Sequence, residues 1–83
     1  LTPHEFRLLQ TLMASPGNVF TRGELLAHIY PRHEAIVIDR VVDVHIGRLR
    51  QKIEQNSSDP RYILTVRGVG YQFVEAVYDE KEE

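Results

Sequence analysis

Three observations in this sequence of 83 residues predict a single α+β domain, in which three helices precede a β-hairpin. Two segments open with the Thr-x-x-Glu pattern that is typical of a helix N-terminus. A third segment, residues 40–55, repeats apolar residues at helical spacing. Two β-rich runs follow it and are separated by a glycine-rich turn. With 42% apolar residues, the chain is long enough for one compact core and too short for two.

The first helix is predicted to begin after Thr2, because Thr2 can cap it, Pro3 suits the first helical position and Glu5 completes a capping box. It should end at the turn formed by residues 15–18, which contain Pro and Gly. Apolar residues at helical spacing predict its buried face. That face is centred on Phe6, Leu9 and Met13 and widened by Leu8 and Leu12.

The second helix should follow a short extended piece at residues 19–20. Thr21 and Glu24 form the second capping box, and Pro31 ends the helix near Tyr30. Its apolar stripe consists of Leu25, Leu26 and Ile29.

The third helix is predicted over residues 40–55, with Asp39 as a plausible cap. A loop at residues 31–38 precedes it, and the apolar second half of that loop places Ile36 and Ile38 as candidates for the core. At 100° per residue the helix has a narrow buried face and an opposite outer face. The buried face comprises Val42, Ile46, Leu49 and Ile53, and the outer face Arg40, Val44, Gly47, Arg48 and Gln51.

A β-hairpin is predicted over residues 62–74, with its turn at residues 67–70. Three helices followed by a hairpin make the winged variant of the helix-turn-helix arrangement. We expect this winged-helix domain to occupy residues 1–78 and residues 79–83 to form an acidic flexible tail.

The charge distribution favours nucleic acid as the partner. The whole chain has a net charge of −2, yet residues 40–67 carry +3 and residues 75–83 carry −4. Arg48 and Gln51 on the third helix match guanine and adenine edges, and Val44 matches a thymine methyl. Arg67 at the hairpin tip can reach a phosphate or a minor groove. The alternative is that these side chains only solvate a helix face and a turn.

Other functional classes find little support in the sequence. The chain has no cysteine, its histidines lack metal-binding spacing, and no serine lies in a nucleophile context, so we expect no metal, no cofactor and no enzyme activity. Gly68 and Gly70 lack the third glycine of a dinucleotide fingerprint. Apolar runs are too short for a membrane helix, and the absence of cysteine suits the cytoplasm.

Four stretches of the chain form an ordered set of motifs. They are Leu1-Thr2-Pro3-His4-Glu5-Phe6-Arg7-Leu8-Leu9, Pro16-Gly17-Asn18-Val19-Phe20-Thr21-Arg22, Val42-Asp43-Val44-His45-Ile46 with Arg48-Leu49-Arg50, and Thr65-Val66-Arg67-Gly68-Val69-Gly70-Tyr71. In this order, over about residues 1–74, they resemble the OmpR/PhoB-type effector domain, the DNA-binding half of two-component response regulators. The family's small N-terminal antiparallel sheet has no counterpart before the first helix here.

The resemblance implies a transcription factor that binds tandem direct repeats of double-stranded DNA as a head-to-tail dimer. It also implies control through a receiver domain that a sensor histidine kinase phosphorylates. In the family the loop before the recognition helix contacts RNA polymerase, which here corresponds to Arg32, His33 and Glu34. The alternative function is a winged-helix module that binds only proteins.

The family's DNA contacts can be carried over residue by residue. Arg48 and Val44 fall at base-reading positions, and Arg67 falls at the groove-reaching position of the wing, with Thr65 beside it on the wing. Gly47 and Val41 depart from the family pattern, which often has a basic or polar residue and a Thr there. Positions that usually meet phosphates are occupied by Arg40, His45 and Arg50.

Overall fold

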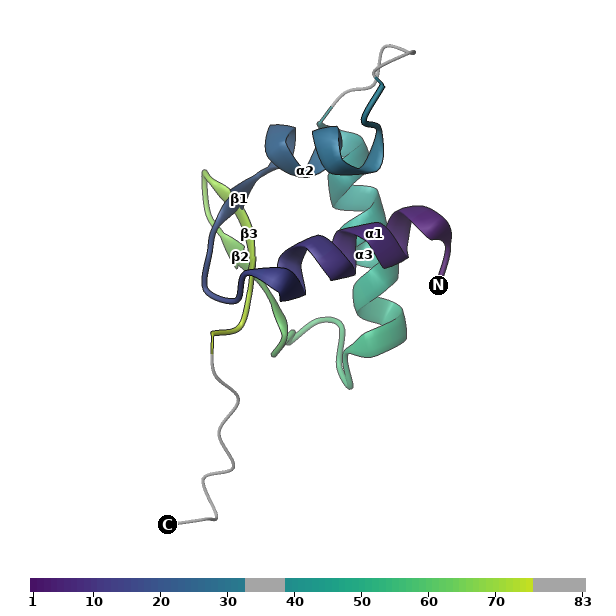
Figure 1. Ribbon diagram of the computed structural model, residues 1–83. Coiled ribbons are helices and arrows are strands. Elements are labelled where there is room, and N and C mark those ends of the chain that lie inside the picture. Colours follow the sequence, from purple (N-terminus) through teal and green to yellow (C-terminus); the bar gives the residue numbers. More distant parts are fainter. Residues whose placement is uncertain (33–38, 76–83) are drawn as a thin grey trace.

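The computed structural model describes residues 1–32 and 39–75 (Figure 1). The predicted order of helix, short strand, helix, helix and hairpin is confirmed. The third helix ends two residues before its predicted end, at the start of an extended segment. The elements are α1 (Pro3–Ala14), β1 (Phe20–Thr21), α2 (Arg22–Ile29), α3 (Arg40–Ile53), β2 (Ile63–Val66) and β3 (Gly70–Phe73). The expectations for Ile36, Ile38 and the acidic tail lie outside the described residues.

Both predicted capping boxes are present, so local sequence determines where α1 and α2 begin. The Thr2 hydroxyl accepts the Glu5 N–H at 3.2 Å, and the Glu5 carboxylate accepts the Thr2 N–H at 3.0 Å. Thr21 and Glu24 repeat this reciprocal pair at α2. Asp39 occupies the predicted N-cap position of α3, but it has helical backbone angles and its side chain makes no capping hydrogen bond within the described part of the chain.

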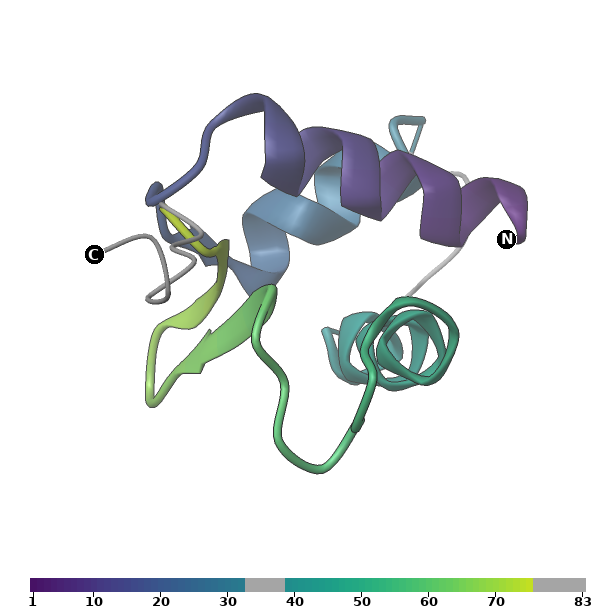
Figure 2. The ribbon, with the colours of Figure 1, turned by 90° about the horizontal axis from the view of Figure 1, so that it is seen from below.

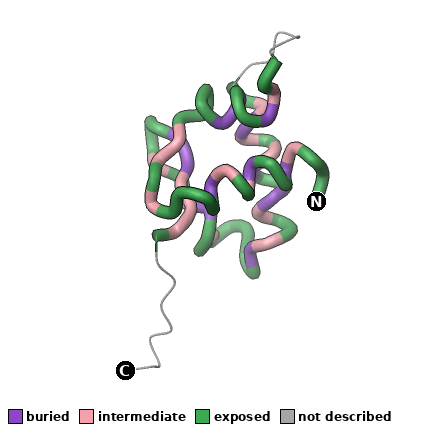
Figure 3. The backbone as a smooth tube through the Cα atoms, viewed as in Figure 1, coloured by how far each residue is buried: buried purple, intermediate pink, exposed green. Residues whose placement is uncertain are grey.

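One apolar cluster, with members from the three helices and the hairpin, forms the core. Figure 3 marks the buried positions along these elements. Of the face predicted for α1, Leu8 and Leu12 are buried and Leu9 packs against the core, but the predicted centre of the face is displaced by about one residue, or 100° of helix rotation. Phe6 is 56% exposed and Met13 is 50% exposed, because α2 and α3 pack against the face that carries Leu8 and Leu12. The buried apolar residues are Leu8, Leu12, Leu25, Leu26, Ile29, Val42, Ile46, Leu49, Ile63 and Tyr71.

A three-stranded antiparallel sheet in the order β1-β3-β2 attaches the hairpin to the helices. Phe20 pairs with Tyr71 and Thr21 with Gly70, a pairing that the sequence did not predict. At Gly70 the two backbones approach so closely that a Cβ atom would overlap the carbonyl group of Phe20. The hairpin lies to one side of the three helices (Figure 2), where β3 contacts α1 and Arg50 of α3 binds the Ile63 carbonyl oxygen of β2.

Candidate nucleic-acid interface

The outer face of α3 faces solvent as the helical spacing predicts. Val42, Ile46 and Leu49 are buried, whereas the predicted outer residues are exposed. Val44 is the apolar member of this face, and it is 47% exposed. The exposed outer residues are Arg40, Val44, Gly47, Arg48 and Gln51, and Val41 is half-buried at the edge. This arrangement presents two arginines, one glutamine and one apolar side chain along a single helix.

Gly47 lies in the middle of this outer face without a packing reason for being glycine. A Cβ atom added there would meet no other atom within 4 Å in the described part of the chain. Its φ is not in the left-handed region, so the backbone does not require glycine either. The departure from the family pattern therefore leaves open space beside Arg48.

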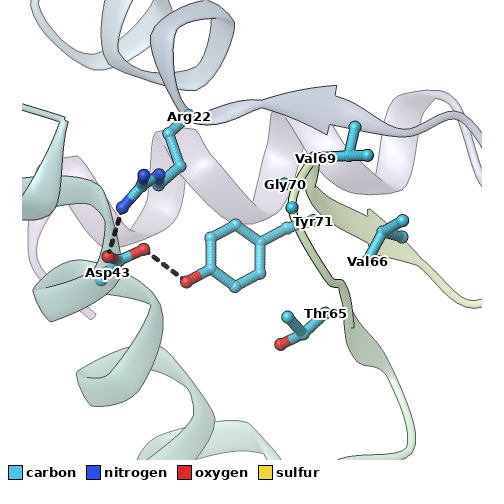
Figure 4. Close-up of a pocket in the computed structure, with 8 residues that line it drawn as sticks. Arg22, Asp43, Thr65, Val66, Val69, Gly70 and Tyr71 are labelled. Atoms are coloured by element: carbon cyan, nitrogen blue, oxygen red, sulfur yellow. Dashed lines mark hydrogen bonds and ion pairs between the residues drawn. The ribbon is translucent and has the colours of Figure 1, made fainter.

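Asp43 joins α3 to both neighbouring elements (Figure 4). Its carboxylate accepts a hydrogen bond from the Tyr71 hydroxyl of β3 at 2.5 Å and from Arg22 Nη1 of α2 at 2.9 Å. Burial, together with the hydrogen bond to Asp43, raises the pKa of Tyr71 to about 12. Asp43 thereby restricts the rotation of α3 about its own axis, because two different elements hold one side chain.

A pocket of about 260 Å³ opens beside Asp43, between α3, the start of α2 and the hairpin (Figure 4). Its walls include Thr65, Val69 and Gly70 of the hairpin as well as the Arg22–Asp43 ion pair. Sequence reasoning missed Asp43 and Tyr71 as members of this region. Their only local signal is a carboxylate next to the buried Val42 and a tyrosine on a short strand.

Arg50 connects α3 to the hairpin rather than extending into solvent. Its Nε and Nη2 donate to the Ile63 carbonyl oxygen at 3.2 and 2.7 Å, and Nη2 also donates to Thr65 Oγ1 at 2.9 Å. The guanidinium lies 5.5 Å from the centroid of the Tyr71 ring. Two predicted DNA contacts, Arg50 and Thr65, are thus hydrogen-bonded to each other.

The hairpin tip carries Arg67 and Val69, which are both exposed. Gly68 between them has φ of +76°, a conformation that suits glycine in a tight turn. The Val69 N–H donates to the Val66 carbonyl oxygen at 2.9 Å and closes the turn. Arg67 therefore extends into solvent from a well-defined turn.

His45 faces α1 and is half-buried. Its ring centroid lies 5.1 Å from that of His4, and His4 in turn lies 4.6 Å from Tyr30. His45 Nδ1 is buried and has no hydrogen-bond partner among the described residues. Burial, and to a smaller extent the charges of His4 and Arg48, lower the pKa of His45 below its usual value. The predicted phosphate contact of His45 stays a prediction.

The described residues contain no group of three potential metal ligands, and none of their helices is long and apolar enough to cross a membrane. Of the predicted polymerase-contact residues, Arg32 is exposed. His33 and Glu34 lie outside the described residues.

Comparison with known proteins identifies the family. Residues 1–73 match the family described as "Transcriptional regulatory protein, C terminal". The transcriptional regulatory protein BaeR of Escherichia coli O6:H1 is 48% identical over 73 residues, which cover 88% of this chain and 30% of BaeR. The chain thus spans less than a third of that relative.

Solved structures agree with this match. One is the response regulator DrrB of Thermotoga maritima, an OmpR/PhoB homologue, whose TM-score with this chain is 0.80. The two are 43% identical, and the match covers 89% of this chain and 33% of the DrrB chain. The DNA-binding domain of response regulator AdeR, in complex with an intercistronic region, has a TM-score of 0.75 and 35% identity over 89% of this chain and 71% of that chain. This winged-helix chain therefore belongs to the family of C-terminal domains of transcriptional regulatory proteins.

Proposed function

We propose that this domain binds double-stranded DNA and is the output domain of a phosphorylation-controlled transcriptional response regulator. One observation carries the proposal: α3 and the hairpin lie next to each other in the fold (Figure 2), and each carries an exposed arginine, Arg48 and Arg67. A helix fits the major groove and a hairpin tip reaches the adjacent backbone or minor groove. The DNA-binding domain of AdeR, solved in complex with an intercistronic region, supports the proposal of DNA binding.

The proposed contacts divide into three groups. Arg48, Val44 and Gln51 read base edges in the major groove, because they lie at the centre of the exposed face. Arg67 contacts the backbone or the minor groove from the wing. Arg40, His45 and Arg50 lie nearest to phosphates, and Arg50 does so while it remains bound to the hairpin.

The finer parts of the proposal concern whole-length regulators, because this chain covers only 30% of the length of its relative BaeR. They are binding to tandem direct repeats as a head-to-tail dimer, control by a receiver domain and a sensor histidine kinase, and a cytoplasmic location. A contact between RNA polymerase and Arg32, His33 and Glu34 belongs to the same group. The match to the C-terminal part of transcriptional regulatory proteins supports a regulatory role within a larger protein.

The experiment that tests DNA binding compares Arg48→Ala with Arg67→Ala on a selected duplex and on random duplex. Loss of Arg48 should cost roughly 1–3 kcal/mol on the selected duplex only, because it removes a base contact. Loss of Arg67 should weaken binding to both duplexes and reduce the salt dependence, because it removes a contact with the charged backbone. Fluorescence anisotropy at several salt concentrations measures both effects.

The wild-type domain is the reference for these measurements. Equal losses on both duplexes for Arg48→Ala would remove Arg48 from base reading. Absence of any salt-dependent binding by the wild-type domain would contradict the proposed function and favour a module that binds only proteins.

A further inference from the structure

The connection between α3 and the hairpin is held by one buried carboxylate. Glu54, the residue directly after α3, is only 8% exposed. Its Oε1 accepts the N–H groups of Arg61 and Tyr62 at 2.8 and 3.3 Å. Its Oε2 accepts those of Tyr62 and Ile63 at 3.1 and 2.9 Å. Three consecutive backbone donors at the start of the hairpin therefore converge on a single side chain.

Ile63, the first residue of β2, is bound to the helical region through both of its backbone polar groups. Its N–H donates to Glu54, and its carbonyl oxygen accepts from Arg50, one helical turn earlier. Because Glu54 follows α3 without an intervening residue, the orientation of α3 determines where its carboxylate lies. Hydrogen bonds are directional, so these contacts determine the orientation of β2 relative to α3 as well as its distance.

The hairpin tip amplifies any change at this attachment. Arg67 lies four residues beyond Ile63, which corresponds to roughly 13 Å along an extended strand. A tilt of about 10° at Ile63 would therefore move the tip by roughly 2 Å at that spacing. This displacement is enough to break a hydrogen bond between Arg67 and a nucleic-acid backbone.

We propose that Glu54 is a positioning residue for the wing: by binding the backbone of residues 61–63, it holds the hairpin at the angle to α3 that lets Arg48 and Arg67 contact one duplex together. The inference rests on the proposed DNA-binding function for its consequence, although the angle itself does not depend on DNA. Glu54 acts through the hairpin and has no contact with DNA of its own, because its side chain is buried.

Glu54→Gln tests the proposal because it keeps the shape of the side chain and replaces one acceptor oxygen with a donor. Residual dipolar couplings from NMR report the angle between α3 and the hairpin without DNA. We expect this angle to change and the amides of residues 61–63 to exchange faster with solvent. Couplings identical to those of the wild type would overturn the proposal, whether or not the domain binds DNA.

A double-mutant cycle with Arg67→Ala then tests the consequence for binding. In the wild-type background we expect Arg67→Ala to weaken binding about tenfold, as the loss of one charge-assisted contact. In the Glu54→Gln background the same change should cost about twofold or less, because two residues that act through one contact are not additive. An undiminished tenfold loss in that background would overturn the positioning role and leave DNA binding itself intact.

Glu5→Gln is the matched control. Glu5 is likewise a buried carboxylate near α3, yet it binds the start of α1 and Lys52 rather than the hairpin. It should lower the melting temperature but leave both the hairpin angle and the cost of Arg67→Ala unchanged. If Glu54→Gln does not fold, Glu54→Asp serves instead, since it keeps the charge but is too short to bind all three amides. The angle of the hairpin and the cost of Arg67→Ala, measured in the Glu54→Asp background, then test the proposal in the same way.

Discussion

α3 is held on two sides by different kinds of interaction. Toward α1 and α2 it contributes Val42, Ile46 and Leu49 to the apolar cluster. Among the described residues it also forms an ion pair with each of these helices, Lys52 with Glu5 of α1 at 2.7 Å and Asp43 with Arg22 of α2 at 2.9 Å. Toward the hairpin it uses polar contacts, through Asp43, Arg50 and the following Glu54. Apolar burial is not directional, whereas hydrogen bonds are. The helical side therefore provides most of the stability, and the hairpin side determines the angle of the wing.

The largest expected effect comes from Gly70→Ala on the hairpin side. A Cβ atom at this position would overlap the backbone of Phe20, which cannot move away without breaking the pairing of β1 with β3. We expect a loss of about 3 kcal/mol or more in the free energy of unfolding, at the upper end of the usual cost of overpacking. Denaturant titration measures it.

Gly23→Ala is the control for Gly70→Ala. At that position the nearest atom to an added Cβ is Thr21 Oγ1 at 3.9 Å, so the change should be mild. A loss below about 1 kcal/mol for Gly70→Ala, within the range of tolerated changes in well-packed regions, would break the comparison. It would mean that the sheet adapts as easily as the apolar side.

Gly47→Ala should have a smaller effect and should raise the free energy of unfolding. Gly47 lies on the outer face of α3, and so faces neither the other helices nor the hairpin. The added methyl group meets open space, and alanine is favoured over glycine within a helix by about 1 kcal/mol. The midpoint of denaturation should rise accordingly, and the dipolar couplings of the hairpin should stay as in the wild type. A shift of the hairpin in this variant would show that α3 transmits changes from its outer face to the wing.

The smallest expected effect concerns pH and the α1 side. Burial comes first among the causes that lower the pKa of His45, followed by the charges of His4 and Arg48, and Glu5 opposes them. The unfolded chain therefore takes up a proton near pH 6.5 before the folded chain does. The contribution of neutral His45 to the free energy of unfolding is complete above that pH, and it is lost as the pH falls through the lower pKa of the folded state.

Melting temperatures at pH 7.5 and 5.5 should thus differ more for the wild type than for His45→Gln. The exposed His28 gives the control, because His28→Gln should retain the full difference. Hairpin couplings should be the same at both pH values, since His45 faces α1. If acidification instead rotated the hairpin, the two sides of α3 would not be independent.

Local patterns in the sequence predicted the helices but not how the hairpin attaches to them. Thr2 and Thr21 begin their helices through residues only three positions away, and the narrow apolar stripe of α3 left one possible outer face. The centre of the α1 face was misplaced because its five apolar residues span about 160° of the helix, and only the positions of α2 and α3 select Leu8 and Leu12 among them. Glu54 binds residues seven to nine positions away, and no spacing rule indicates such a contact.

Glu54 binds only main-chain N–H groups, and this has a consequence for how related sequences can diverge. Every residue except proline supplies such a group, so the side chains at positions 61 and 62 are interchangeable as far as the attachment is concerned. The exposed side chain of Arg61 can therefore change with the surface that the wing approaches, whereas the Tyr62 ring also stacks on Phe73 of β3. Proline at position 61, 62 or 63 is the substitution that this design does not tolerate. Evolution can therefore alter the chemistry at the base of the wing without moving the wing.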